Sequence, residues 1–115
     1  MHGIIANVIK LKLKQGIDSG YRWPITDANK QPVDLTGYTA KCQVRSENDF
    51  VSTILAEMDT AVHDSGVDVI WTAVQSFAWN FQKGFFDVVL IDPAGKPVQI
   101  VAEGEVFVNR VVTHV

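Results

Sequence analysis

The sequence contains few of the residues that define a specialised class of protein. Cys42 is the only cysteine among 115 residues, which excludes an intramolecular disulfide framework. No apolar run approaches the roughly 20 residues that a helix needs to span a bilayer. The N-terminus has no basic segment followed by an apolar block, so we expect no secretion signal and expect the chain to be made and folded in the cytosol.

Neither sign of charge predominates. Ten lysines and arginines stand against thirteen acidic residues, which gives a formal net charge of −3. Because nucleic acid binding needs a concentrated basic footprint, we do not expect nucleic acid as a partner. The one local basic feature is Lys10, Lys12 and Lys14, which alternate with apolar residues. On a strand these lysines would share one solvated face and protect an edge.

Motifs for catalysis and for cofactor binding are missing as well. The glycines form neither G-x-G-x-x-G nor G-x-x-x-x-G-K-[ST]. His2, His63 and His114 lie at the two ends and in a turn, without the spacing of metal ligands. Cys42 is in phase with inward-facing neighbours, which favours a core role over a nucleophilic one. We therefore expect a protein that is not an enzyme, with no catalytic residue, no cofactor and no metal site.

What the sequence does contain is a hydrophobic period of two. Apolar residues, 47% of the chain, recur in short alternating runs between turn residues. Residues 50–58 fit a strand or a helix, and the strand is favoured. Residues 73–83 fit one helical turn or an irregular crossover with aromatic anchors at Phe77, Trp79 and Phe81. Strands are predicted at 8–14, 21–25, 38–45, 67–72, 84–91, 97–102 and 103–112.

Seven or eight short antiparallel strands predict an all-β fold in one domain, residues 1–115, built as a two-sheet sandwich. The strand at 84–91 contains two adjacent phenylalanines, Phe85 and Phe86, of which only one can face the core. Residues 88–91 are apolar on both faces, so this strand is expected to be covered by another layer or to pair with a neighbouring subunit.

Residues 32–38 read as a strand corner. Asp34 and Thr36 are expected to bond to neighbouring backbone amides, Leu35 to turn inward, and Gly37 to supply a positive φ where the bend requires it. None of these side chains is a poised nucleophile.

Several segments, taken together, carry a family resemblance: Tyr21-Arg22-Trp23-Pro24, residues 27–32, Val33-Asp34-Leu35-Thr36-Gly37-Tyr38, Gln43-Val44-Arg45, residues 85–90, residues 92–96, and a closing Gly104 with Val111-Val112-Thr113. This series resembles the N-terminal domain of phage baseplate upper proteins and related Ig-like modules of tailed-phage structural proteins. That family carries a D-x-x-G-x-P-x-D-L-T-G core. Lys30 stands where the family often has glycine, so we expect Asn29 to take the left-handed conformation instead.

The resemblance implies an Ig-like β-sandwich that acts as a non-enzymatic structural and interaction module of a tailed-phage particle. It implies a place in the virion, in the baseplate, tail or head, and assembly by protein–protein contacts with other phage structural proteins, with a homo-oligomer expected. Neither nucleic acid nor membrane is an expected partner. The alternative is a carbohydrate-binding β-sandwich with exposed aromatic rings, for which Trp23 and Trp79 are the candidates.

Overall fold

The structure, a computed structural model, describes residues 7–47 and 51–109. This part of the chain forms seven strands and one short helix, and it is all-β in class. The elements in chain order are β1 (Asn7–Lys14), β2 (Ser19–Pro24), β3 (Thr39–Arg45), β4 (Ile54–His63), β5 (Gly66–Trp71), α1 (Ala73–Phe77), β6 (Lys83–Ile91) and β7 (Pro97–Asn109).

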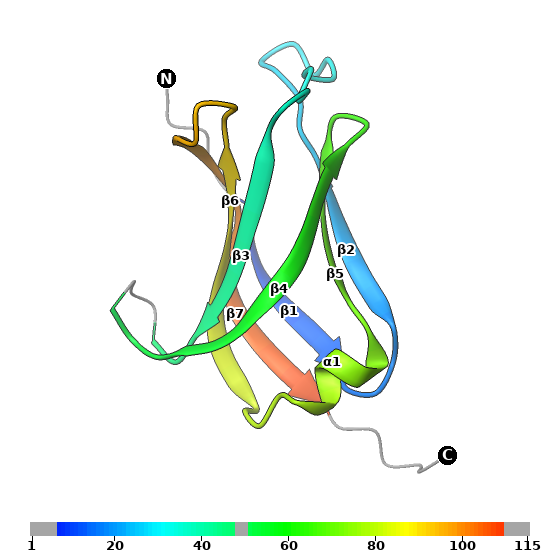
Figure 1. The fold of residues 1–115 in the computed structure, drawn as a ribbon, viewed down its shortest axis with the longest axis vertical. Helices are drawn as coiled ribbons and strands as arrows, with labels where there is room; N and C mark the ends of the chain where they lie inside the picture. Colours follow the sequence, from blue (N-terminus) through cyan, green and yellow to red (C-terminus); the bar gives the residue numbers. More distant parts are fainter. Residues whose placement is uncertain (1–6, 48–50, 110–115) are drawn as a thin grey trace.

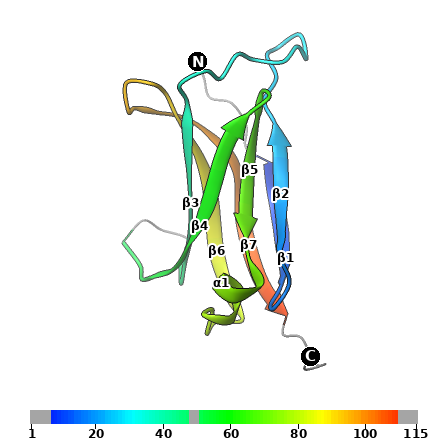
Figure 2. The same cartoon turned by 45° about the vertical axis from the view of Figure 1, so that its right-hand side comes forward.

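The strands form one sheet in the order β1-β7-β6-β3-β4-β5-β2, which curls into a half-barrel (Figure 1). Its two edge strands, β1 and β2, follow each other in the chain and lie close together in Figure 2. There the hydroxyl of Tyr21 donates to the backbone oxygen of Lys12 at 3.4 Å. All neighbouring pairs are antiparallel except β1 and β7, which run parallel. The prediction of an entirely antiparallel fold is therefore wrong at this pair.

Strand β4 joins two parts of the sheet. Its first half, Ile54 to Met58, pairs with β3, and its second half, Asp59 to His63, pairs with β5. Hydrogen bonding therefore continues through β4 where a sandwich would have a break. The two separate facing sheets that the sequence predicts are not confirmed, although the strand count is.

The core fills the inside of the curl, and the period of two decides which residues enter it. Leu11 and Leu13 are each 1% exposed, whereas the three lysines that alternate with them, Lys10, Lys12 and Lys14, are exposed. Phe86 is buried and Phe85 lies on the outer face, as the alternation requires. The buried apolar residues are Leu11, Leu13, Trp23, Ile25, Leu35, Cys42, Val44, Met58, Val67, Val69, Trp71, Trp79, Phe81, Phe86, Val88, Leu90, Val101, Ala102, Val106 and Val108.

The strand corner at residues 32–38 is confirmed. Leu35 is buried in the core, and Gly37 has a φ of 82°. The carboxylate of Asp34 accepts hydrogen bonds from the backbone N–H of Thr36 at 3.0 Å and from its hydroxyl at 2.7 Å. These two bonds hold the pKa of Asp34 below its ordinary value, because they stabilise the charged form.

Two loops of the fold share one design. The carboxylate of Asp27 accepts N–H groups two and four residues later, at 2.8 and 3.0 Å, and Asp92 does the same at 3.0 and 2.9 Å. The fourth residue of each loop has a positive φ: Lys30 at 62° and Gly95 at 85°. Lys30 itself takes the left-handed conformation, so the prediction that Asn29 would do so is wrong.

Because a left-handed lysine is strained, Lys30→Gly is expected to raise the free energy of unfolding by about 1 kcal/mol. The reciprocal change, Gly95→Lys, is the matched control, since a Cβ at Gly95 meets no atom within 4 Å. It is expected to lower the same quantity by about 1 kcal/mol. Urea unfolding measures both. Equal signs for the two variants would contradict this account of the loops.

Candidate interaction surface

Helix α1 is short, and its first turn is fixed by local hydrogen bonds. The hydroxyl of Thr72, the N-cap residue, accepts the backbone N–H of Gln75 at 3.1 Å. The side-chain oxygen of Gln75 accepts the backbone N–H of Thr72 at 2.8 Å in return. This capping box satisfies two backbone donors that a helix start leaves open, so five residues suffice for a defined helix here.

Buried polar contacts fasten α1 to the connection between β1 and β2. The side-chain amide of Gln15, one of two buried polar residues among those described, donates to the backbone oxygens of Ser76 at 2.9 Å and Trp79 at 3.1 Å. The hydroxyl of Ser76 accepts the backbone N–H of Gly16 at 2.6 Å. Ser76 is fully buried, and it is the buried residue of α1. The side of the helix that faces the body of the protein is therefore the side of Ser76, a polar residue.

Two aspartates add contacts on either side of the helix. The carboxylate of Asp18 accepts the backbone N–H of Ala73 at 2.5 Å. The carboxylate of Asp59, on β4, accepts the side-chain amide of Gln75 at 2.7 Å. Since one bond comes from the connection between β1 and β2 and the other from β4, they fix the position of α1 against the sheet.

The apolar residues of α1 point outward as a result. Val74 is 81% exposed and Phe77 is 65% exposed, and they lie three residues apart on neighbouring positions of the helix surface. Trp79 and Phe81, just after the helix, are buried. The prediction of aromatic anchors therefore holds for these two residues, but it is wrong for Phe77. We call Val74 and Phe77 the apolar knob.

An open hollow lies beside α1, the middle of β4 and the end of β5. It contains two carboxylates, those of Asp18 and Asp59, and the exposed side chain of Ile70. Trp71 lines this hollow, and its indole N–H is buried without a hydrogen-bond partner among the described residues. The hollow is lined by Asp18, Ser19, Asp59, Ile70, Trp71, Thr72 and Gln75. No lysine or arginine among the described residues lines it.

A second hollow continues along β4 and adds Glu57, again without a basic lining residue among those described. Glu57 is exposed, accepts a hydrogen bond from Gln43 at 3.0 Å, and lies 3.9 Å from the ammonium of Lys41. We call Asp18, Glu57 and Asp59 the acidic face.

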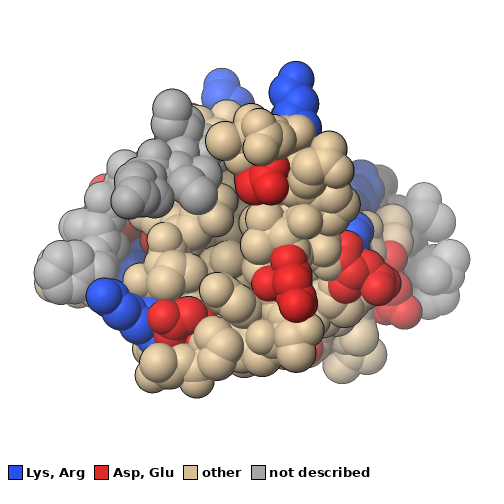
Figure 3. Space-filling view, turned by 90° about the horizontal axis from the view of Figure 1, so that it is seen from above, with Lys and Arg blue, Asp and Glu red and all other residues tan. Residues whose placement is uncertain are grey.

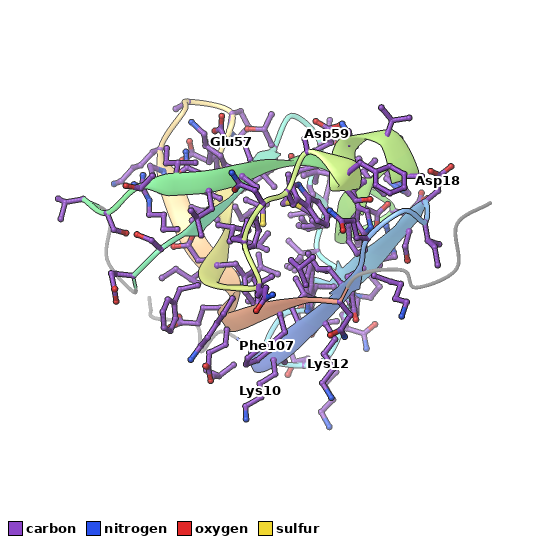
Figure 4. All side chains as sticks on the ribbon, turned by 90° about the horizontal axis from the view of Figure 1, so that it is seen from below. Lys10, Lys12, Asp18, Glu57, Asp59 and Phe107 are labelled. Atoms are coloured by element: carbon purple, nitrogen blue, oxygen red, sulfur yellow. The ribbon has the colours of Figure 1, made fainter. Side chains whose placement is uncertain are left out.

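The opposite side of the molecule carries the lysines of β1. Figure 4 shows Lys10 and Lys12 pointing away from the body on the side opposite to Glu57 and Asp59, with Phe107 beside them. Phe107 is the register partner of Lys12 on β7. Val8 is 75% exposed at the start of the same outward row. We call the row Val8, Lys10, Lys12 and Lys14 the lysine face.

The end of the molecule away from α1 carries acidic side chains near its middle and on one flank, with basic ones at other margins (Figure 3). Near this end Arg22 of β2 binds the carboxylate of Asp68 at 2.8 Å and the backbone oxygen of His63 at 2.7 Å. The imidazole of His63 lies 3.0 Å from the carboxylate of Asp64 and 2.6 Å from that of Asp68. These carboxylates, Asp64 first, raise the pKa of His63. The network links β2, β4 and β5.

The structure separates the other residues that the sequence singled out. Trp23 and Trp79 are each 7% exposed, which removes them as rings for stacking on a sugar. Cys42 is buried, and burial, followed by the charge of Asp87, raises the pKa of its thiol to about 12. His2 and His114 lie outside the described residues.

Neither the family models nor the curated proteins give a match to this chain. In the described part, no helix has the length and apolar character to cross a membrane. Within residues 7–47 and 51–109, no group of three or more His, Cys, Asp or Glu side chains is placed to hold a metal ion.

Proposed function

We propose that this chain is a non-enzymatic structural and interaction module of a tailed-bacteriophage particle, which acts in the baseplate, tail or head through protein–protein contacts. The observation that carries the proposal is the apolar knob: Val74 and Phe77 are exposed on a helix that buried polar bonds hold in place. Exposed apolar groups on a rigid support bind a partner with little loss of conformational entropy. Such an arrangement suits a module whose work is to contact its neighbours.

The strand order supports the finer part of the proposal, an Ig-like module. An immunoglobulin domain places strands B, E and D in one sheet and C, F and G in the other. Counted along this chain, β2, β5 and the second half of β4 follow the order B, E, D, while β3, β6 and β7 follow the order C, F, G. The half-barrel is then an Ig-like fold in which one continuous β4 connects the two layers.

The sequence supports the phage part of the proposal. The corner at residues 32–38, whose hydrogen bonds are described above, matches the P-x-D-L-T-G part of the phage-module pattern. Hydrogen bonds within the corner hold its residues in place, so the outer surfaces of the module stay free for contacts.

The genes next to the gene for this chain are expected to encode portal, terminase or tail proteins. A position within a metabolic operon would contradict the proposal.

Replacing the knob tests the proposal directly. Val74→Ser with Phe77→Ser is expected to change the free energy of unfolding by less than about 0.5 kcal/mol, because both side chains are already in water. Incorporation of the double variant into purified phage particles, supplied in place of the wild-type chain and measured by quantitative mass spectrometry, is expected to fall by about tenfold or more.

Val98→Ser with Ile100→Ser is the matched control, since both residues are exposed apolar side chains of β7, and incorporation should stay at the wild-type level. Incorporation of the knob variant at the wild-type level would refute the role of α1. Absence of the wild-type chain from purified particles would refute the phage role itself.

A further inference from the structure

The two broad sides of the molecule carry unlike charges. Within the described residues, no ion pair is formed by Lys10, Lys12, Asp18 or Asp59. The acidic face and the lysine face lie on opposite sides of the molecule (Figure 4). Each side therefore presents charge that the fold itself leaves without an opposite partner at ion-pair distance.

The two sides also match in spacing and in apolar content. Lys10 and Lys12 are two residues apart on β1, and Glu57 and Asp59 are two residues apart on β4, so each pair is separated by about 7 Å. Apolar surface adjoins both pairs, with exposed Val8 on one side and exposed Ile70 on the other. A lysine that reaches a carboxylate can lay its aliphatic stem on such apolar surface.

We propose that the lysine face of one copy docks on the acidic face of a second copy, with Lys10 and Lys12 reaching Glu57 and Asp59. The inference rests on the proposed function, since it names one partner of the module: the same chain. Among the described residues, the hollows at the acidic face are lined by three carboxylates and by no lysine or arginine. The nearest base is Lys41, which lies 3.9 Å from Glu57 with both side chains more than half exposed, so it does not neutralise this face.

Glu105 on β7 is the register partner of Lys10, and it already has its own cation. Its carboxylate binds the ammonium of Lys83 at 2.9 Å, and this bond first, with the charge of Lys10 as a smaller contribution, lowers the pKa of Glu105. Lys10 and Lys12 form no ion pair among the described residues, so both remain available for contact with another molecule.

The contact uses two different surfaces, so it does not end with a pair. Each docked copy keeps one of its two faces unused, so the pair still presents one face of each sign. Head-to-tail contacts of this kind close into a ring or continue as a filament. The wild-type chain is therefore expected to form assemblies larger than a dimer as its concentration rises. A higher salt concentration should dissociate these assemblies, because ions screen the attraction between exposed charges.

Charge exchange tests the contact. Lys10→Glu with Lys12→Glu, and separately Glu57→Lys with Asp59→Lys, are each expected to weaken self-association by about tenfold or more, because like charges then meet. An equimolar mixture of the two variants, or one chain with all four changes, restores opposite charges at every contact and should associate again. Sedimentation velocity between micromolar and millimolar concentrations measures the sizes.

The mixture and the chain with all four changes also control for folding. If a charge-exchanged variant had lost association because it unfolded, adding the opposite exchange would not bring the association back. Lys96→Glu is the matched control, because it changes an exposed lysine in the turn between β6 and β7, outside both faces, and it should leave assembly intact. A wild-type chain that stays monomeric, a double variant that assembles like the wild type, or a mixture that stays monomeric would each overturn the inference. A monomeric wild type that still enters phage particles through the apolar knob would leave the proposed function standing.

Discussion

Gly104→Ala is expected to detach β1 from the sheet and to lower the free energy of unfolding by more than about 3 kcal/mol. Gly104 lies in β7 with a φ of +146°, a backbone conformation that residues with a Cβ rarely adopt. A Cβ at this position would overlap the backbone oxygen of Ile9 on β1. Backbone atoms cannot move aside as a flexible side chain can, so the pairing of the two strands must give way.

Urea unfolding gives the energy, and hydrogen exchange of the β1 amides locates the damage. Gly95→Ala is the control, because Gly95 also has a positive φ but has open space around it. It should cost about 1 kcal/mol, from backbone strain alone. If the two alanine variants lost equal stability, the close approach of β1 to Gly104 would not be the cause.

Gln15→Leu is expected to cost about 2 kcal/mol and to loosen α1 before any strand. Leucine has a similar volume, but it removes the amide that reaches the backbone oxygens of Ser76 and Trp79. The oxygen of Trp79 would then be left without its donor in a buried place. Hydrogen exchange is expected to speed up first in residues 73–81.

Under the proposed function, incorporation into phage particles should fall together with the order of the helix, since the proposal has the apolar knob bind from a fixed support. Gln31→Leu is the control: Gln31 is an exposed loop residue whose amide makes a single long contact of 3.5 Å. It should change stability by less than about 0.5 kcal/mol. Faster exchange over the whole sheet in Gln15→Leu, with α1 no faster than the strands, would contradict the local role of Gln15.

The features that sequence reasoning predicted are those set by near neighbours in the chain. Alternation places Leu11 and Leu13 inside and the lysines outside, and it separates Phe86 from Phe85. The corner at residues 32–38 follows from the short polar side chains around Leu35. The β6–β7 hairpin also follows, although β7 continues through the boundary predicted at residue 102.

The features that escaped prediction depend on partners far along the chain. The two-residue hydrophobic period predicts which residues of a strand face inward and which face outward. It does not predict which strand pairs with it, or whether the two strands run parallel or antiparallel. The parallel pairing of β1 with β7 and the shared strand β4 are of this kind. Because of these two pairings, the strands form one continuous curled sheet and not two separate sheets.

The candidate site escaped prediction for a different reason. A helix of five residues is too short for its hydrophobic period to be read, so Phe77 looked like another core aromatic. The inward position is held by Ser76 with Gln15, which is the reverse of the usual arrangement of an amphipathic helix. A lone glutamine at the end of an alternating strand was the only local sign of it.

The parallel pairing of β1 and β7 has a mechanical consequence. Asn7 begins β1 beside Ala102, and Lys14 ends it beside Asn109, so the first and last described strands leave the body at opposite ends (Figure 1). A pull that separates those two ends would load the hydrogen bonds of this pair in shear, all at once and not one after another. Joined in series between two other proteins, such a module would transmit tension along its long axis while keeping its shape.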